Sequence, residues 1–185
     1  ELFLPVGVAL SILPIGLAGY LFFAFEEGDA AFQFVEKAPW VEPWGISWHL
    51  GVDGISLLLV VLTTILVPIS LAASTSITDR VRLFVAMVLV LEAGLIGVFL
   101  SVDLFLFFVF FEVILVPMYF IIGIWGSERR IYAAIKFFIF TAFGSALMLA
   151  GVIAMALLHR PAALILESEV SYVREAGGAV TAIRV

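Results

Sequence analysis

The sequence contains no cysteine and few charged residues. Among its 185 residues, 13% are charged and 64% are hydrophobic. The absence of cysteine excludes disulfides, thiolate-bound metals and cysteine-ligated iron–sulfur clusters on this chain. A soluble domain is usually about one quarter charged, so the composition also excludes an ordinary water-soluble fold.

Basic charge is scarce as well. Nine Lys and Arg stand against 15 Asp and Glu, which gives a net charge of -6, and the basic residues are scattered along the chain. We therefore expect no nucleic-acid partner, since such a partner needs a basic surface. The two histidines are far apart and lack the spacing of metal ligands, so no metal site is expected.

The sequence does contain long hydrophobic runs. A helix needs about 20 apolar residues to cross a hydrocarbon core of about 30 Å. Five runs meet this requirement and predict an all-α transmembrane fold with five spanning helices. We expect a transmembrane helical bundle over residues 1–158 and an extracytoplasmic loop or short helix over 159–185, leading to further sequence. The predicted spans are 2–25, 55–73, 83–100, 104–125 and 132–158.

The connections between the spans predict their orientation. Four arginines lie in the connections 74–82 and 126–131, whereas the connection 26–54 has Lys37 as its only basic residue. The positive-inside rule places the arginine-containing connections in the cytoplasm. The third and fourth spans are joined by so few residues that they must be antiparallel neighbours. Because the chain opens at Glu1 without Met, we expect it to be internal to a longer gene product.

Polar and aromatic residues mark the ends of the spans. Asp53 and Asp103 each come directly before a span, where an acidic side chain can cap the helix. Trp40, Trp44 and Trp48 lie in the acidic connection 26–54 and fit an interfacial belt.

Three ionisable side chains lie inside the predicted spans: Glu92, Glu112 and Lys136. Each costs roughly 2.5–3.5 kcal/mol near the bilayer centre unless it finds a partner, water or its neutral form. Glu92 and Glu112 occupy similar depths on antiparallel neighbours. If they face each other, desolvation and like charge would favour holding a proton between them. The alternative is two separately hydrogen-bonded acids.

Glu112 is the stronger candidate because no nearby polar residue on its own helix could satisfy it. Pro117 lacks the N–H that would bond the carbonyl of Val113, which leaves an acceptor beside the acid. Lys136 lies about five residues into its span, roughly 7 Å deep and too far from Glu112 for a direct ion pair. It could extend to the interface or face the bundle interior as a relay group.

Four segments resemble a known family. They are GVDGISL at 51–57, IGVFLSVDLFLFF at 96–108, FEVILVPMYF at 111–120 and RIYAAIKFFIFT at 130–141. They resemble the antiporter-like membrane subunit, chain M, of NADH–quinone oxidoreductase, respiratory complex I, which is the counterpart of mitochondrial subunit 4. The resemblance implies a fourteen-helix fold, of which this chain would supply the second to sixth helices in the N-terminal part.

The resemblance also implies roles for the three charged residues. Glu112 would be the fifth-helix glutamate essential to proton translocation, Lys136 the lysine near the start of the sixth helix, and Glu92 an acid that many members carry on the fourth helix. The seventh-helix lysine that partners the glutamate in the family has no counterpart among these 185 residues.

The function implied by the resemblance is proton translocation in the membrane arm, coupled to quinone reduction through an intramembrane Glu/Lys relay. The chain would carry no cofactor, and NADH, FMN, iron–sulfur clusters and quinone would be bound by partner subunits. Other membrane-arm subunits and the lipid bilayer would be its partners, in a bacterial inner membrane. The alternatives are a sodium/proton antiporter subunit, a photosynthetic relative of the complex, or a structural membrane scaffold.

Overall fold

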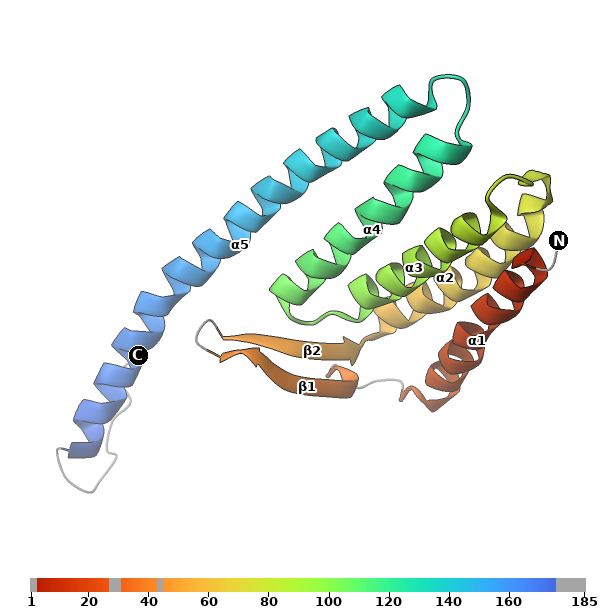
Figure 1. Cartoon of the computed structure of the whole chain (residues 1–185). Coiled ribbons are helices and arrows are strands. Elements are labelled where there is room, and N and C mark those ends of the chain that lie inside the picture. Colours follow the sequence, from red (N-terminus) through yellow and green to blue (C-terminus); the bar gives the residue numbers. More distant parts are fainter. Residues whose placement is uncertain (1–2, 27–30, 43–44, 176–185) are drawn as a thin grey trace. The chain divides into compact units, whose positions relative to one another are not determined.

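The structure is a computed structural model that describes residues 3–26, 31–42 and 45–175, with side chains as far as residue 158. Within these residues, five helices are long and apolar enough to cross a membrane, which confirms the predicted all-α transmembrane fold. The chain forms two compact units, residues 1–145 and 146–185. The helices are α1 (Phe3–Ala24), α2 (Gly54–Ala73), α3 (Val81–Leu100), α4 (Leu104–Trp125) and α5 (Arg130–Glu175), as Figure 1 shows.

The connection between α1 and α2 contains a β-hairpin that the sequence analysis did not predict. Strand β1 (Gln33–Val41) pairs antiparallel with strand β2 (Ile46–Val52). Apolar and polar residues alternate only weakly in this acidic segment, so the sequence lacks the two-residue periodicity that predicts a strand.

The hairpin is fixed to the end of the bundle where α3 is joined to α4. The N–H of Val102 donates to the carbonyl of His49 at 2.9 Å. The Trp48 ring lies 5.8 Å from the Phe110 ring, centroid to centroid, in an edge-to-face arrangement. A two-stranded hairpin is marginal on its own in water, so these contacts with the bundle stabilise it.

Helix α5 is longer than the sequence analysis predicted. It continues without interruption to Glu175, so residues 159–175 are helical and not the loop or short helix expected after the fifth span. Seven of the 17 residues of this segment are Ala, Leu or Glu, which are strong helix formers. Residues 176–185 lie outside the described residues.

The packed core lies between α1, α2 and α3. Val67 and Leu71 of α2 form a buried cluster with Phe84, Val85 and Val88 of α3. Two residues of α1, Leu4 and Val8, pack against this cluster from the other side. At Gly7, between them, a Cβ atom would clash with the side chain of Val85, so glycine permits the close approach of α1.

Helices α3 and α4 meet along a second contact, made by two glycines of α3. A Cβ atom at Gly94 would come within 2.9 Å of Ile114, and one at Gly97 would clash with the ring of Phe110. Small residues of this kind let transmembrane helices approach closely. We refer to Gly94, Gly97, Phe110 and Ile114 as the glycine seam.

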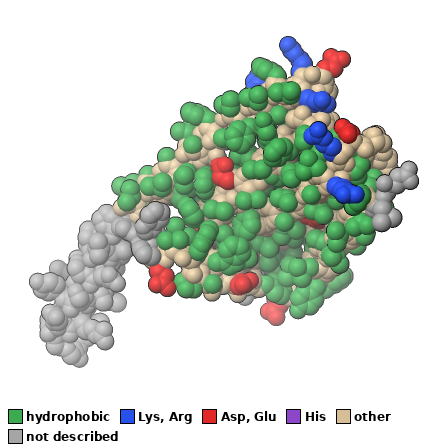
Figure 2. Space-filling model, viewed as in Figure 1, with side chains coloured by type: hydrophobic (Ala, Val, Ile, Leu, Met, Phe, Trp, Pro, Cys, Tyr) green, Lys and Arg blue, Asp and Glu red, His purple; other side chains and the backbone are tan. Residues whose placement is uncertain are grey.

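The surface has the character expected of a membrane-spanning bundle. Figure 2 shows hydrophobic side chains over most of the visible face, with Lys and Arg gathered toward one end. Many large hydrophobic side chains are exposed on the surface, among them Phe23 at 89% and Phe140 at 82%. Lipid or other helices must cover such side chains in the membrane.

Candidate proton-translocation site

Glu92 lies on the face of α3 that packs toward α1 and α2. It follows Val85 and Val88 at the spacing of one helical face, and these two valines belong to the buried cluster with α2. The side chain of Glu92 is 3% exposed. Its Oε1 atom is buried and has no hydrogen-bond partner among the described residues.

Glu112 lies on the face of α4 that packs toward α5. It begins a helical stripe that continues through Val116, Tyr119 and Gly123. The Tyr119 ring lies 5.6 Å from the Phe138 ring of α5. Further along the stripe, a Cβ at Gly123 would lie 3.5 Å from the Cβ of Ala134 of α5.

The two acids therefore do not face each other. The side of α4 that contacts α3 is formed by Phe110 and Ile114 of the glycine seam. Glu112 lies two residues from each of them, which places it on the opposite side of α4 because successive residues are rotated by about 100°. The structure therefore shows neither a facing pair nor two hydrogen-bonded acids, because neither side chain has a hydrogen bond to a described residue.

Ser145 of α5 lies at the same level as Glu112. The helices are antiparallel, so two turns back along α4 from Tyr119 to Glu112 correspond to two turns forward along α5 from Phe138 to Ser145. Ser145 is 4% exposed, and its hydroxyl donates to the carbonyl of Ala142 at 3.0 Å. The lone pairs of its oxygen remain able to accept a hydrogen bond.

Glu112 is half-buried and forms no hydrogen bond or ion pair with any described residue. Pro117 lies inside α4 and is buried. Because it has no N–H, it leaves the carbonyl of Val113, one residue from Glu112, without its usual helical donor. One turn further toward the α4–α5 connection, Val116, Tyr119, Ile135 and Phe138 line a hollow between the two helices.

Lys136 is not brought close to Glu112. It is exposed and lies two residues from Ala134, which is 1% exposed and faces α4. Lys136 therefore occupies the opposite side of α5. Its Nζ lies 5.8 Å from the centroid of the Tyr132 ring, within the range of a cation–π interaction.

Asp53 and Asp103 are helix caps, as the sequence analysis predicted. The Asp53 carboxylate accepts from the N–H of Ser56 at 2.6 Å, and the Ser56 hydroxyl accepts from the N–H of Asp53 at 2.9 Å. The backbone N–H and then the hydroxyl of Ser56 hold the pKa of Asp53 below its usual value. Asp103 accepts from the N–H groups of Phe105 and Leu106 at 2.8 and 3.2 Å.

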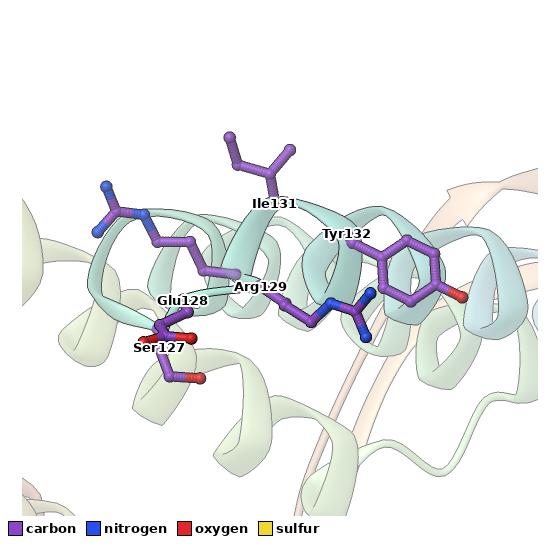
Figure 3. Close-up of a pocket in the computed structure, with 7 residues that line it drawn as sticks. Ser127, Glu128, Arg129, Ile131 and Tyr132 are labelled. Carbon is purple, nitrogen blue, oxygen red and sulfur yellow. The ribbon is translucent and has the colours of Figure 1, made fainter.

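The α4–α5 connection forms a large hollow away from both acids. Figure 3 shows Ser127 and Glu128 on the turn, with Arg129 beside them and Ile131 and Tyr132 on the first turn of α5. The charged side chains that line this hollow belong to a polar turn between two spans. None of the three predicted site residues, Glu92, Glu112 and Lys136, lines it.

Four buried hydroxyl side chains were not among the residues predicted from the sequence. Ser145 lies on α5 at the level of Glu112, and Ser11, Thr63 and Thr64 lie on α1 and α2, which pack against α3. The available signal was helical spacing. Ala134, Phe138, Thr141 and Ser145 follow one face of α5, but the sequence does not say which face contacts α4.

Comparison with known proteins agrees with this architecture. Residues 30–98 match the family described as the amino terminus of NADH-ubiquinone oxidoreductase chain 4. Residues 101–177 match the transmembrane family of NADH:quinone oxidoreductase and Mrp antiporters. The two matches adjoin and together include Glu92, Glu112 and Lys136.

Individual relatives extend the comparison. The chain is 45% identical to NADH-quinone oxidoreductase subunit M of Rhodobacter capsulatus over 81% of this chain and 29% of that protein. It is 41% identical to NAD(P)H-quinone oxidoreductase chain 4 1 of Picosynechococcus over 71% of this chain and 25% of that protein. The chain therefore spans less than a third of the length of these relatives.

A solved structure shows the same fold. The respiratory complex I of Thermus thermophilus with bound NADH contains a chain that is similar to this one with a TM-score of 0.74 and 31% sequence identity, over 82% of this chain and 31% of that chain. The helices described above thus have the fold of a chain in that complex. The chain belongs to the antiporter-like subunit M (chain 4) family of NADH–quinone oxidoreductase and corresponds to part of such a subunit.

Proposed function

We propose that this chain is part of a membrane-arm subunit of complex I and translocates protons, with Glu112 as the carboxyl that takes up and releases the proton. The supporting observation is the position of Glu112 in the middle of α4, half-buried and without a hydrogen bond or ion pair to any described residue. An acid in such a place is costly unless it exchanges protons or meets a mobile partner.

The proposed mechanism depends on a cation that approaches and leaves Glu112. An opposite charge within about 4–6 Å stabilises the carboxylate, and its withdrawal favours the protonated form. Lys136 lies on the other side of α5, so the approaching lysine must come from outside the five helices described. Lys136 would act as a relay group nearer the cytoplasm, and Glu92 as a separate proton-holding group between α1, α2 and α3.

The remaining parts of the proposal concern the assembly. We propose that quinone reduction elsewhere in the complex changes the electrostatics of the membrane arm and drives the movement of the lysine. This chain would hold no redox centre, and NADH, FMN, iron–sulfur clusters and quinone would be bound by partner subunits. The other membrane-arm subunits and the lipid bilayer are its proposed partners, in a bacterial inner membrane.

The test is the Glu112→Gln substitution in the intact complex, reconstituted into vesicles. The number of protons pumped per NADH oxidised should fall sharply, while the complex still assembles. Glu128→Gln, on the polar α4–α5 turn, is the matched control and should pump normally. Normal proton stoichiometry in the Glu112→Gln complex would refute the proposal and favour the scaffold role.

Two further candidate functions are a subunit of a photosynthetic relative of the complex and a sodium/proton antiporter subunit. The higher identity to subunit M of Rhodobacter capsulatus than to the Picosynechococcus chain favours the respiratory complex over its photosynthetic relative. If the chain were a sodium/proton antiporter, transport by the reconstituted vesicles should depend on external sodium. Unchanged proton transport after sodium is removed would exclude the antiporter.

A further inference from the structure

The hollow at the α4–α5 connection is lined by residues 126–132 and is mainly basic (Figure 3). Arg129 and Arg130 line it against a single acid, Glu128, and the first turn of α5 contains no acid. Its volume of about 810 Å³ lies within the range of small-molecule sites, roughly 300–1,000 Å³. We refer to this feature as the arginine hollow.

The two arginines of this hollow are not neutralised by any described residue. Both side chains are exposed, and neither guanidinium forms an ion pair or a hydrogen bond within the described part of the chain. Their backbone, in contrast, is held in place. The N–H of Arg130 donates to the carbonyl of Ser127 at 3.0 Å, and the N–H of Ala133 donates to the carbonyl of Arg129 at 3.0 Å. The turn is therefore fixed, while its positive charges remain available to an anion.

The start of α5 adds to the attraction for an anion. The first N–H groups of a helix have no helical carbonyl to bond, and the helix dipole favours negative charge beside them. The guanidinium group of arginine forms two parallel hydrogen bonds with a phosphate, because its planar fork matches the phosphate oxygens. The arginine hollow therefore suits a phosphate group in particular.

A third cation, Lys136, lies on the same side of α5. Arg129 and Lys136 are seven residues apart, which is close to two full helical turns. The Nζ of Lys136 lies 5.8 Å from the centroid of the Tyr132 ring, one turn nearer to the arginine hollow. The lysine side chain therefore extends back toward the hollow, as lysines do near the ends of spanning helices.

Two apolar grooves run along α5 from the arginine hollow. A ridge formed by Tyr132, Lys136 and Phe140 lies between them and lines both. Ala133 and Phe137 complete one groove, and Ile135 and Ile139 complete the other. Both grooves begin at Tyr132, which also lines the arginine hollow, and they extend about 12 Å along the helix to Phe140. The basic hollow thus continues directly into a pair of apolar grooves.

This face of α5 is not covered by the other described helices. Ala134, which is buried, turns the opposite side of α5 toward α4. The ridge residues Tyr132 and Phe140 are 64% and 82% exposed, and no described residue of another helix lines either groove. An apolar face of this size must be covered by lipid or by another helix. The basic charge at its end favours a lipid with a negative headgroup.

We propose that the start of α5 is a binding site for an anionic phospholipid. The lipid phosphate lies in the arginine hollow, within reach of Arg129, Arg130 and the ammonium group of Lys136. Its two acyl chains lie in the two grooves, one on each side of the ridge. A free phosphate ion or an acidic peptide would leave the grooves empty, and the ammonium group of a zwitterionic headgroup would be repelled by the same three cations.

This inference goes beyond the proposed function and does not depend on Glu112. Lipid binding is measured without proton transport, so a complex that fails the pumping test can still bind the lipid. A complex that pumps normally can likewise fail to bind it.

The test is photolabelling of the intact complex in phosphatidylcholine vesicles that contain a trace of lipid with a diazirine in one acyl chain. Phosphatidylglycerol and phosphatidylcholine probes are compared, and mass spectrometry locates the labelled residues. Each basic residue near the headgroup strengthens the binding of an anionic lipid about fivefold, so phosphatidylglycerol should label residues 132–140 at least about fivefold more. Equal labelling by the two probes would overturn the proposal in favour of unselective lipid contact. The absence of labelling by either probe would overturn it by showing that protein covers this face.

Variants of the arginine hollow locate the headgroup. Arg129→Gln should lower labelling by phosphatidylglycerol about fivefold, and Arg129→Lys, which keeps the charge, should retain most of it. Arg80→Gln removes an exposed arginine from the α2–α3 connection and is the matched control, which should be labelled like the wild type. Unchanged labelling in Arg129→Gln would contradict the placement of the phosphate. The comparison of the two probes on the wild type needs no variant, so it tests the site even if a variant does not assemble.

Discussion

The N–H of Ser47 in the hairpin donates to the carboxylate of Asp103 at 3.0 Å, across 56 residues of sequence. The Ser47 hydroxyl donates to the same oxygen at 3.3 Å. The other oxygen of Asp103 caps α4. One side chain thus joins the hairpin to the start of α4.

We expect Asp103→Ala to loosen the hairpin and to destabilise α4. Loss of the cap costs about 1 kcal/mol, and the bonds to Ser47 contribute a similar amount. Trypsin should then cut more rapidly at Lys37, the basic residue of β1. Asp103→Asn retains an acceptor and should be cleaved at nearly the normal rate, as should the control Asp79→Ala. Equal rates for Asp103→Ala and the wild type would contradict the joint role of Asp103.

The cap at Asp53 predicts a dependence of stability on pH. Hydrogen bonds from Ser56 lower the pKa of Asp53 from its usual 3.8. A lowered pKa in the folded state stabilises the fold above pH 3.8, and this contribution is lost as the pH falls through the lower folded value. Ser56→Ala should therefore lower stability near neutral pH and weaken its decrease under acid. Thermal unfolding of the purified complex, measured from neutral to acidic pH, would show this difference.

The glycine seam predicts intolerance to added volume. Gly97→Ala forces a methyl group against the ring of Phe110, and overpacking of this kind costs typically 1–3 kcal/mol. Phe110→Leu in the same chain should restore part of the loss. Gly144→Ala, which meets no atom within 4 Å, is the matched control and should be neutral or slightly stabilising. Unfolding in denaturing detergent provides the comparison.

Ser145 should support the chemistry of Glu112 without being essential to it. No hydrogen bond joins the two side chains in the structure, so the expected effect is that of a bond formed when Glu112 carries its proton. Such a bond contributes about 1 kcal/mol, so Ser145→Ala should slow proton pumping by about fivefold while NADH oxidation by uncoupled complexes stays near normal. Ser74→Ala removes an exposed hydroxyl at the end of α2 and should have no effect. A pumping rate unchanged by Ser145→Ala would separate this serine from the proposed site.

Much of this architecture could be predicted from the sequence, because the bilayer imposes simple demands on length and polarity. The fourth span, 104–125, agrees with α4 at both ends, and both aspartate caps are present. The hairpin escaped prediction because its stability comes from contacts with α4, at Trp48 and Asp103, that are distant in sequence.

The site was harder to predict than the fold. Sequence spacing gives the depth of Glu92 and Glu112 but not their rotation about the helix axes, since that depends on which neighbours each helix meets. Gly94 and Gly97 determine this rotation for α3 by admitting Ile114 and Phe110. The faces of α5 and α2 that carry the buried Ser145 and Thr64 could likewise not be assigned until the helix contacts were known.

The glycine seam has an electrical consequence. Its tightly packed side chains, Phe110 and Ile114, offer no group that could hand a proton from α3 to α4, so the seam insulates one acid from the other. Across the seam itself, Glu92 and Glu112 can influence each other through the electric field or through a tilt of the paired helices.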